Sequence, residues 1–251
     1  AIIAQCQNYV SRDRIFEAIS AENPGEAHQC LATCIEVCAR FKEAYFDYKA
    51  KSKNQWKITT NALFVRLDAF SERCQDIMHL TKTIIQFTAL QKIEIGNTKG
   101  KAMTASIMTV FSEFTKAVDD FMLVKYDILD IEKREFDDDF FKFRQRVKEL
   151  ERRLASVITQ AFDDCSTVGT TFKLLDSFEG LLERPIIQDE LEKKYIGLVQ
   201  SYGGDLKTVQ ELFLHFRDNC PIAWNLPPIA GALTCCRGLV ERIEIPFVKL
   251  N

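Results

Sequence analysis

Apolar side chains recur at intervals of three and four residues along most of the chain. Four segments follow this pattern most clearly: 27–48, 60–90, 102–126 and 136–162. Because an α-helix has about 3.6 residues per turn, this spacing places each row of apolar side chains on one face of a helix. The pattern therefore predicts four long helices.

Each predicted helix has its own apolar row. The first row comprises Cys30, Cys34, Val37, Phe41, Ala44 and Tyr48. The second comprises Leu63, Leu67, Phe70, Cys74, Ile77, Thr81, Ile84 and Thr88. The third comprises Met103, Ile107, Val110, Phe114, Ala117, Phe121 and Val124, and the fourth Phe136, Phe140, Phe143, Val147, Leu150, Leu154, Val157 and Ala161. Further apolar residues flank these rows: Phe64, Met108, Phe111, Ile158 and Phe162. A two-stranded coiled coil would expose the flanking positions, whereas a bundle buries them on several neighbours, so a bundle is favoured.

The predicted fold class is all-α, an elongated array of long antiparallel helices that form consecutive helical bundles. Only 10 glycines and 6 prolines interrupt the 251 residues, which is few for a β or α/β protein. No change in composition separates two domains, so residues 1–251 are expected to form one helical-bundle region, with sub-bundles at 1–165 and 166–251.

Polar and helix-breaking stretches predict where the helices begin and end. "ENPGE" at 22–26 precedes the helix of 27–48, and the polar connector "KAKSKNQWK" follows it. "EFDDDFF" opens another helix, because its aspartates complement the positive end of the helix dipole. Pro185 separates a short helix from one that runs towards residue 217. "NCPIAWNLPP" is the longest break, and a last helix runs from it towards Pro246.

Composition and charge narrow the function classes. The chain is 47% hydrophobic and 27% charged, with a net charge of −3, so there is no general nucleic-acid footprint and no nucleic-acid partner is expected. No apolar run approaches the roughly 20 residues of a membrane span, so no membrane partner is expected either. The nine cysteines are odd in number and lie among apolar residues, which favours reduced thiols and a cytoplasmic protein. The chain begins with Ala1 rather than methionine, and it is interpreted as a piece of something larger.

The stretch "KIEIGNTKGKAMT" at 92–104 is close to a phosphate-binding P-loop, G-x-x-x-x-G-K-[ST]. However, three residues rather than four separate Gly96 from Gly100, and Ala102 follows Lys101 where a hydroxyl is needed. The better interpretation is a helix-turn hinge at Gly96 and Gly100 between two antiparallel helices. ATP binding at this turn, abolished by Lys101→Ala, is the enzymatic alternative.

Cysteine and histidine positions predict neither a metal site nor a catalytic site. Cys30, Cys34 and Cys38 lie on one helix face, with His28 nearby, but a structural zinc site needs four convergent ligands. Thiols in an apolar row behave as small hydrophobes. No family signature of nucleophilic catalysis surrounds any cysteine. No catalytic residue, metal ligand or cofactor is therefore predicted.

The one local basic cluster surrounds Trp56. Its lysines are Lys49, Lys51, Lys53 and Lys57. A solvated linker is one interpretation, and a docking contact for an acidic partner is the other.

Several stretches, taken in order, resemble the N-terminal tail region of dynein heavy chains, more specifically the axonemal members. They are Trp56 followed by "LFVRLDAFSERC" (63–74), "FTALQKIEIGNTKGKAM" (87–103), "YDILD" (126–130), "EFDDDFFKFRQRVKELERRLASVITQAFDDC" (135–165), "FKLLDSFEGLLERPII" (172–187), "KYIGLVQSY" (194–202) and "NLPPIAGALTCCRGLVERIEIPFVKL" (225–250). The resemblance covers about residues 45–251. Two positions depart from the family pattern: Cys235 stands where a tryptophan is usual, and Gly203-Gly204 introduces an expected kink.

The resemblance implies a segment of a rod-like tail, with the ATP-hydrolysing AAA+ ring and the microtubule-binding stalk outside it. It also implies a structural role in the cilium or flagellum axoneme: assembling the dynein arm, binding intermediate chains, light chains or a neighbouring heavy chain, and anchoring to docking proteins on the doublet microtubule. The fragment itself is expected not to be an enzyme, and "QAFDDC" and "LLERPII" favour the outer arm. The alternative is a generic helical scaffold or tethering protein unrelated to dynein.

Overall fold

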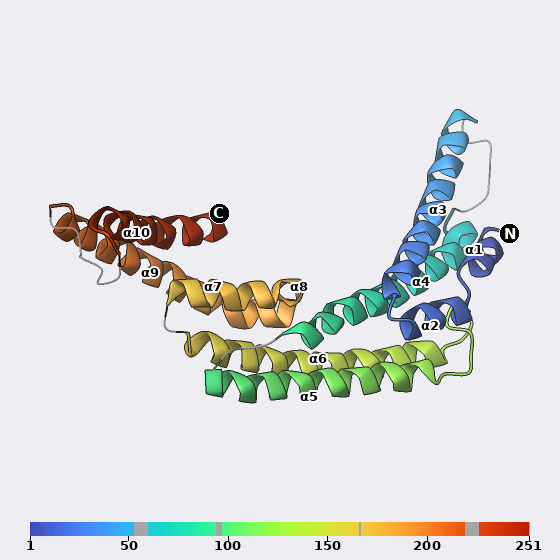
Figure 1. Ribbon diagram of the computed structural model, residues 1–251. Coiled ribbons are helices and arrows are strands. Elements are labelled where there is room, and N and C mark those ends of the chain that lie inside the picture. The colour runs from blue at the N-terminus through green and yellow to red at the C-terminus, as the bar shows by residue number, and fades with distance from the viewer. Residues whose placement is uncertain (53–59, 94–96, 166, 219–225, 251) are drawn as a thin grey trace. The chain divides into compact units, whose positions relative to one another are not determined.

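The computed structural model describes residues 1–52, 60–93, 97–165, 167–218 and 226–250 (Figure 1). These residues form helices and their connections, with no strand among them, so the all-α prediction is confirmed. The helices are α1 (Ile2–Tyr9), α2 (Arg12–Ser20), α3 (Pro24–Lys51), α4 (Thr60–Thr88), the short 3₁₀ helix η1 (Ala89–Lys92), α5 (Asn97–Met122), α6 (Glu135–Asp163), α7 (Val168–Ser177), α8 (Glu179–Leu182), α9 (Pro185–Phe216) and α10 (Pro228–Leu250).

Local sequence signals account for five of the helix starts: those of α2, α3, α6, α7 and α9. Ser11 caps α2 by accepting a hydrogen bond from the amide of Arg14 at 3.2 Å. Thr167 and Thr170 form a reciprocal capping box at the start of α7. Pro24 and Pro185 are the first residues of α3 and α9, where a missing amide hydrogen costs nothing. As predicted, α6 begins with an acidic first turn.

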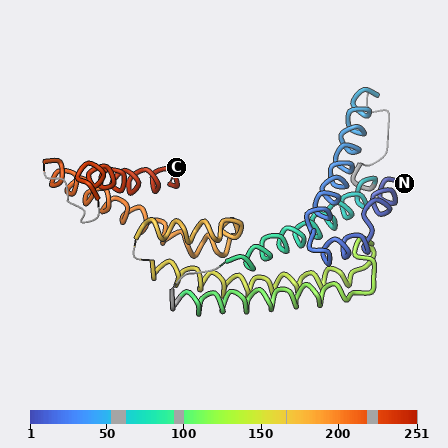
Figure 2. Tube along the Cα trace, in the orientation of Figure 1, coloured from blue at the N-terminus to red at the C-terminus, as the bar shows by residue number. Residues whose placement is uncertain are grey.

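The chain forms two compact units that interleave along the sequence. The first unit comprises Ala1–Gln91 and Phe111–Lys148, and the second comprises Lys92–Val110 and Glu149–Asn251. Helices α5 and α6 run side by side in opposite directions (Figure 2), and each contributes one half to each unit. The sub-bundles at 1–165 and 166–251 stay a prediction.

Aromatic side chains fill the core of the first unit. Phe87 of α4 stacks on Phe114 of α5 with ring centroids 4.2 Å apart, and Phe114 lies 6.3 Å from Phe143 of α6. Phe121 of α5 contacts both Phe136 and Phe143. Aromatic pairs at these distances contribute roughly 0.5–1.5 kcal/mol beyond the area that they bury. The rows predicted for α5 and α6 therefore meet in this core, and α4 contributes Phe87, which lies outside its predicted row.

The second unit has an apolar core that contains a buried ion pair. Leu154, Ile158 and Ile187 are buried, and α10 packs on α7 and α9. Glu151 of α6 forms an ion pair with Arg184, the residue just before α9, and both side chains are at most one-tenth exposed. An ion pair at this depth fixes how the two segments pair, because neither charge is stable there without the other.

The apolar row predicted for α3 is wrong in its second half. Cys30, Cys34 and Cys38 are buried, but Val37 and Phe41 are each 43% exposed. An ion pair from α2 and a hydrogen bond from α1 reach α3 in its first half, whereas in the second half α4 is the neighbour, through Lys42 with Asp68 and Tyr45 with Phe64. A repeat of three and four residues identifies the helix, but it cannot show how far along the helix a neighbour extends.

The two C-terminal helices run through residues that usually interrupt helices. Gly203 and Gly204, where a kink was expected, lie inside the continuous helix α9. Helix α10 was expected to run towards Pro246, but it contains this proline and continues to Leu250. The hydroxyl of Tyr202 in α9 donates a hydrogen bond of 2.8 Å to the carbonyl of Ile243, within the turn that Pro246 disturbs.

Candidate functional site

The P-loop-like stretch leads into helix α5. Gly96 lies outside the described residues, Gly100 is buried in the first turn of α5, and Lys101 is exposed. Residues 89–92, which lead into the stretch and include its first residue, form the 3₁₀ helix η1 rather than the strand that precedes a phosphate-binding loop. The hinge at Gly96 and Gly100 stays a prediction.

The row of cysteines on α3 belongs to a cluster of buried thiols. Cys6 of α1 lies against Cys34 and Cys38, and Cys74 of α4 lies close to the same group. Burial, reinforced by the neighbouring thiols, raises the pKa of Cys34 to about 12 and that of Cys38 to about 11. These thiols are therefore neutral near pH 7. Across the described part of the chain, no group of three or more His, Cys, Asp or Glu side chains is placed to hold a metal ion.

The predicted basic docking cluster begins at the end of α3. Lys49 and Lys51 lie in its last turn, where cations interact favourably with the helix dipole. Lys53, Trp56 and Lys57 lie outside the described residues, so their share of the docking contact stays a prediction. Helix α4 returns antiparallel along α3, and the two form a helical hairpin.

Aromatic side chains gather beside these lysines. Tyr45 and Phe46 of α3 contact Phe64 of α4, with centroid distances of 5.1 and 5.8 Å. Tyr48 is 63% exposed and Val65 of α4 is 60% exposed. We define the hairpin tip as Phe41, Tyr45, Phe46, Tyr48, Lys49 and Lys51 of α3 together with Phe64 and Val65 of α4. Exposed aromatic side chains beside cations are typical of protein-binding surfaces.

An internal ion pair holds the base of the hairpin tip. Lys42 of α3 pairs with Asp68 of α4, and its ammonium group lies 5.9 Å from the centre of the Phe64 ring. The pair links the two helices below the aromatic cluster. Further along α3, Lys49 is half-buried and Lys51 is exposed.

Arg73 is an important residue that the apolar pattern did not single out. Its side chain is almost completely buried beside Cys74, and it reaches the connection between α5 and α6. The guanidinium donates hydrogen bonds of 3.1–3.3 Å to the carbonyls of Ile128, Asp130 and Lys133, and one of 3.0 Å to the carboxylate of Asp137. It also lies 4.1 Å from the centre of the Phe136 ring. Arg73 thereby fixes residues 128–137 to α4.

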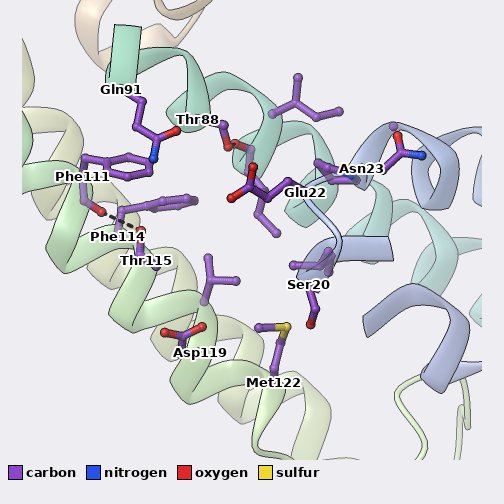
Figure 3. A pocket seen from close by; sticks show the side chains of 16 residues that line it. Ser20, Glu22, Asn23, Thr88, Gln91, Phe111, Phe114, Thr115, Asp119 and Met122 are labelled. Carbon is purple, nitrogen blue, oxygen red and sulfur yellow. Dashed lines mark hydrogen bonds between the residues drawn. The ribbon is translucent and has the colours of Figure 1, made fainter. Parts of the chain in front are cut away.

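A groove opens on another face of the first unit (Figure 3). It encloses about 620 Å³ between the connection from α2 to α3, the end of α4 and the second half of α5. Its apolar lining includes Ile85, Phe111 and Met122, and its two charged lining residues, Glu22 and Asp119, are both acidic. The groove and the hairpin tip therefore carry opposite charges.

Helix α10 carries a further apolar surface. Its exposed apolar residues include Ile229, Leu233, Val240, Ile245, Phe247 and Val248. Within the described residues, no helix is both long enough and apolar enough to cross a membrane.

The whole chain, residues 1–251, matches the family described as "Dynein heavy chain, N-terminal region 1". The chain belongs to this family. The resemblance that the ordered motifs indicated is confirmed, and the chain is the N-terminal region of a dynein heavy chain rather than its AAA+ motor region.

Similar dynein heavy chains come from algae and animals. The chain is 46% identical, over 99% of its length, to the "Dynein beta chain, flagellar outer arm" of Chlamydomonas reinhardtii. It is 30% identical, over its full length, both to the "Dynein beta chain, ciliary" of Tripneustes gratilla and to human "Dynein axonemal heavy chain 17". In each case it spans 6% of the relative's length.

Proposed function

We propose that the chain is a structural and interaction segment of an axonemal dynein heavy-chain tail. In this role it supports assembly of the dynein arm, binds intermediate chains, light chains or a neighbouring heavy chain, and helps to anchor the arm to docking proteins on the doublet microtubule. It works in the axoneme of a cilium or flagellum, within a parent protein that is an ATP-driven microtubule motor. The segment itself is not catalytic.

The observation that carries the proposal is the match of all 251 residues to the N-terminal region of dynein heavy chains. The names of the similar proteins support an axonemal setting, and the 46% identical relative is an outer-arm chain, which favours the outer arm. Exposed apolar and aromatic side chains on the hairpin tip and on α10 support an interaction role, since contiguous patches of this kind on soluble proteins mark binding surfaces.

The predicted docking contact places an acidic partner surface on the hairpin tip. Lys49 and Lys51, together with Lys53 and Lys57, supply positive charge, and Trp56 with the exposed aromatic residues of α3 supplies apolar contact area. Electrostatic complementarity of this kind speeds association and selects partners more than it adds affinity.

The test is charge reversal in the full-length heavy chain, expressed in a cell that assembles the arm. We expect Lys49→Glu with Lys51→Glu to lower the amount of one arm subunit that co-purifies with the heavy chain by about tenfold, since like charges at an interface cost more than about 1.4 kcal/mol. The ATPase activity of the purified heavy chain should be unchanged.

Lys173→Glu with Lys207→Glu is the matched control, because both lysines are exposed on helices of the second unit and the change in net charge is the same. Equal loss of subunits in both double variants would refute docking at the hairpin tip. Normal assembly of arms from a heavy chain that lacks residues 1–251 would refute the proposed function as a whole.

A further inference from the structure

The connection between α2 and α3 contains the only described residue other than glycine with a positive φ, Glu22 at 55°. The amide of Glu22 donates to the carbonyl of Ile19 at 3.2 Å, and the amide of Asn23 donates to that of Ala18 at 2.9 Å. These two hydrogen bonds form a Schellman motif that ends α2. Glycine is usual at the left-handed position of this motif because it has no Cβ to clash.

A glutamate at this position is unfavourable for the backbone, so the motif alone does not explain it. The strained turn places the exposed side chain of Glu22 on one side of the groove. Asp119 of α5 lies on the other side, and it is also exposed (Figure 3). Among the described residues neither carboxylate forms an ion pair, and no lining residue of the groove is basic. Strain kept at a single residue is a recognised feature of binding sites.

The lining between the two carboxylates is apolar and partly open to solvent. Ile85 of α4 is 42% exposed, and Phe111 and Met122 of α5 are half-buried. A small ligand would need a site that encloses most of its surface. An open groove between helices instead suits a helix whose apolar side chains, three and four residues apart, insert along its length.

We infer that this groove binds an amphipathic helix of a partner protein, and that Lys or Arg side chains on the edges of this helix pair with Glu22 and Asp119. The charge requirement separates this partner from the acidic one proposed for the hairpin tip. The inference needs only that the chain acts as an interaction segment, and it does not depend on the lysines of the tip.

The experiment uses the full-length heavy chain assembled in its complex, with a photo-cross-linking amino acid in place of Ile85. The expected result is a cross-link to a peptide of another subunit with apolar residues at helical spacing and at least one Lys or Arg. The same amino acid in place of Asp138, an exposed residue of α6 outside the groove, is the control. The inference would be overturned by equal cross-linking from both positions. It would also be overturned by a cross-link to an acidic peptide or to a peptide of the same heavy chain.

Charge variants then test the mechanism. We expect Asp119→Lys to lower the yield of the cross-link from position 85 by about tenfold. Changing the partner's Lys or Arg to Glu should restore the yield in the Asp119→Lys background. No effect of Asp119→Lys, or no recovery on the exchange of charges, would overturn the inference.

Glu22→Gly separates binding from folding. The substitution relieves the left-handed backbone and removes the carboxylate, so we expect unchanged or higher thermal stability together with about a fivefold lower cross-link yield. Glu22→Gln, which keeps the length of the side chain, should lower the yield to the same degree. A full yield in both variants would assign Glu22 to the turn alone and overturn its role in binding.

The lysines of the hairpin tip are unchanged in all these variants. The outcome of the groove experiments is therefore independent of the test of the proposed function.

Discussion

At the scale of single residues, Arg73 shows how one buried side chain organises a long connection. The connection between α5 and α6 has no regular helix of its own, and three of its carbonyls accept hydrogen bonds from the same guanidinium. Burying a charged group is favourable only when its hydrogen bonds are satisfied. Arg73 meets this condition through backbone carbonyls and Asp137 together.

We therefore expect Arg73→Ala to lower the free energy of unfolding of the first unit by about 3 kcal/mol, since hydrogen bonds to charged groups contribute about 1.5–3 kcal/mol and several are lost together. Arg66→Ala is the matched control. Arg66 pairs with Glu132 of the same connection, but both side chains are 72% exposed, so its loss should change the free energy by less than about 0.5 kcal/mol. Denaturant titration measures both, and similar values for the two variants would contradict the role of Arg73.

The buried thiols give a second prediction at this scale. Because the pKa of Cys34 is raised to about 12, roughly one thiol in 10⁴ is ionised at pH 8, and alkylation needs the thiolate. We expect iodoacetamide at pH 8 to modify the exposed Cys236 in the native protein and to leave Cys34, Cys38 and Cys74 unmodified. Mass spectrometry of digested peptides checks this, with the denatured protein as the control. Rapid native labelling of Cys34 would contradict the burial of the cluster.

The raised thiol pKa values also set a pH dependence. In the unfolded chain a cysteine ionises near pH 8.5, whereas in the folded protein Cys38 keeps its proton until about pH 11. The folded state therefore binds more protons in this interval, and stability falls as the pH rises through it.

At the scale of helices, α10 accepts a hydrogen bond from α9 next to the carbonyl that a proline leaves without its usual amide partner, that of Arg242. Pro246 has no amide hydrogen, and its ring disturbs the preceding turn, which contains Ile243. Tyr202 of α9 donates its hydroxyl to the carbonyl of Ile243 in this turn. We expect Tyr202→Phe to destabilise the second unit by about 1 kcal/mol, the usual net contribution of one such hydrogen bond.

A double-mutant cycle with Pro246→Ala tests whether this hydrogen bond is coupled to the proline. In the Pro246→Ala background the amide of residue 246 can donate to the carbonyl of Arg242 and the turn that contains Ile243 is less crowded, so Tyr202→Phe should cost less than it does in the natural sequence. Additive effects of the two substitutions on thermal unfolding would show that the tyrosine and the proline are not coupled.

The helices themselves were largely predictable, because periodicity is a local property of the sequence. The rows of α4, α5 and α6 predicted both the helices and most of their buried residues. The row of α3 failed from Val37 onward, because burial there depends on where α1 and α2 end. Such an end is decided by the packing of residues far apart in the sequence.

The candidate sites were less predictable, for the same physical reason. Lys49 and Lys51 were identified as a basic cluster, but the aromatic side chains beside them join only when α3 and α4 pair. The helical pattern gives no sign that Arg73, Glu151 and Arg184 are buried, because charged residues in a helix usually lie on its surface. The "ENPG" stretch predicts a break in the chain at Glu22. The positive φ of Glu22 was not predictable from it, because this angle follows from the hydrogen bonds of the turn.

At the scale of the whole molecule, the two compact units share two continuous helices. The first half of α5 and the second half of α6 belong to the second unit, and the remaining halves belong to the first. A unit that interleaves in this way cannot be separated by cutting the chain once. Its cooperativity must be tested within the intact segment.

Hydrogen exchange measured by mass spectrometry on two variants provides this test. Arg184→Ala leaves the carboxylate of Glu151 buried without its partner, which costs about 3–5 kcal/mol. If each unit opens as its own cooperative body, exchange should rise in α7, α9 and the second half of α6, while α3 and α4 keep their protection. Arg73→Ala should give the reverse pattern.

Arg152→Ala is the control, since Arg152 and its partner Glu149 are more than 60% exposed and little protection should be lost. A uniform rise over all the helices in either buried-arginine variant would instead mean that α5 and α6 couple the two units into a single cooperative body.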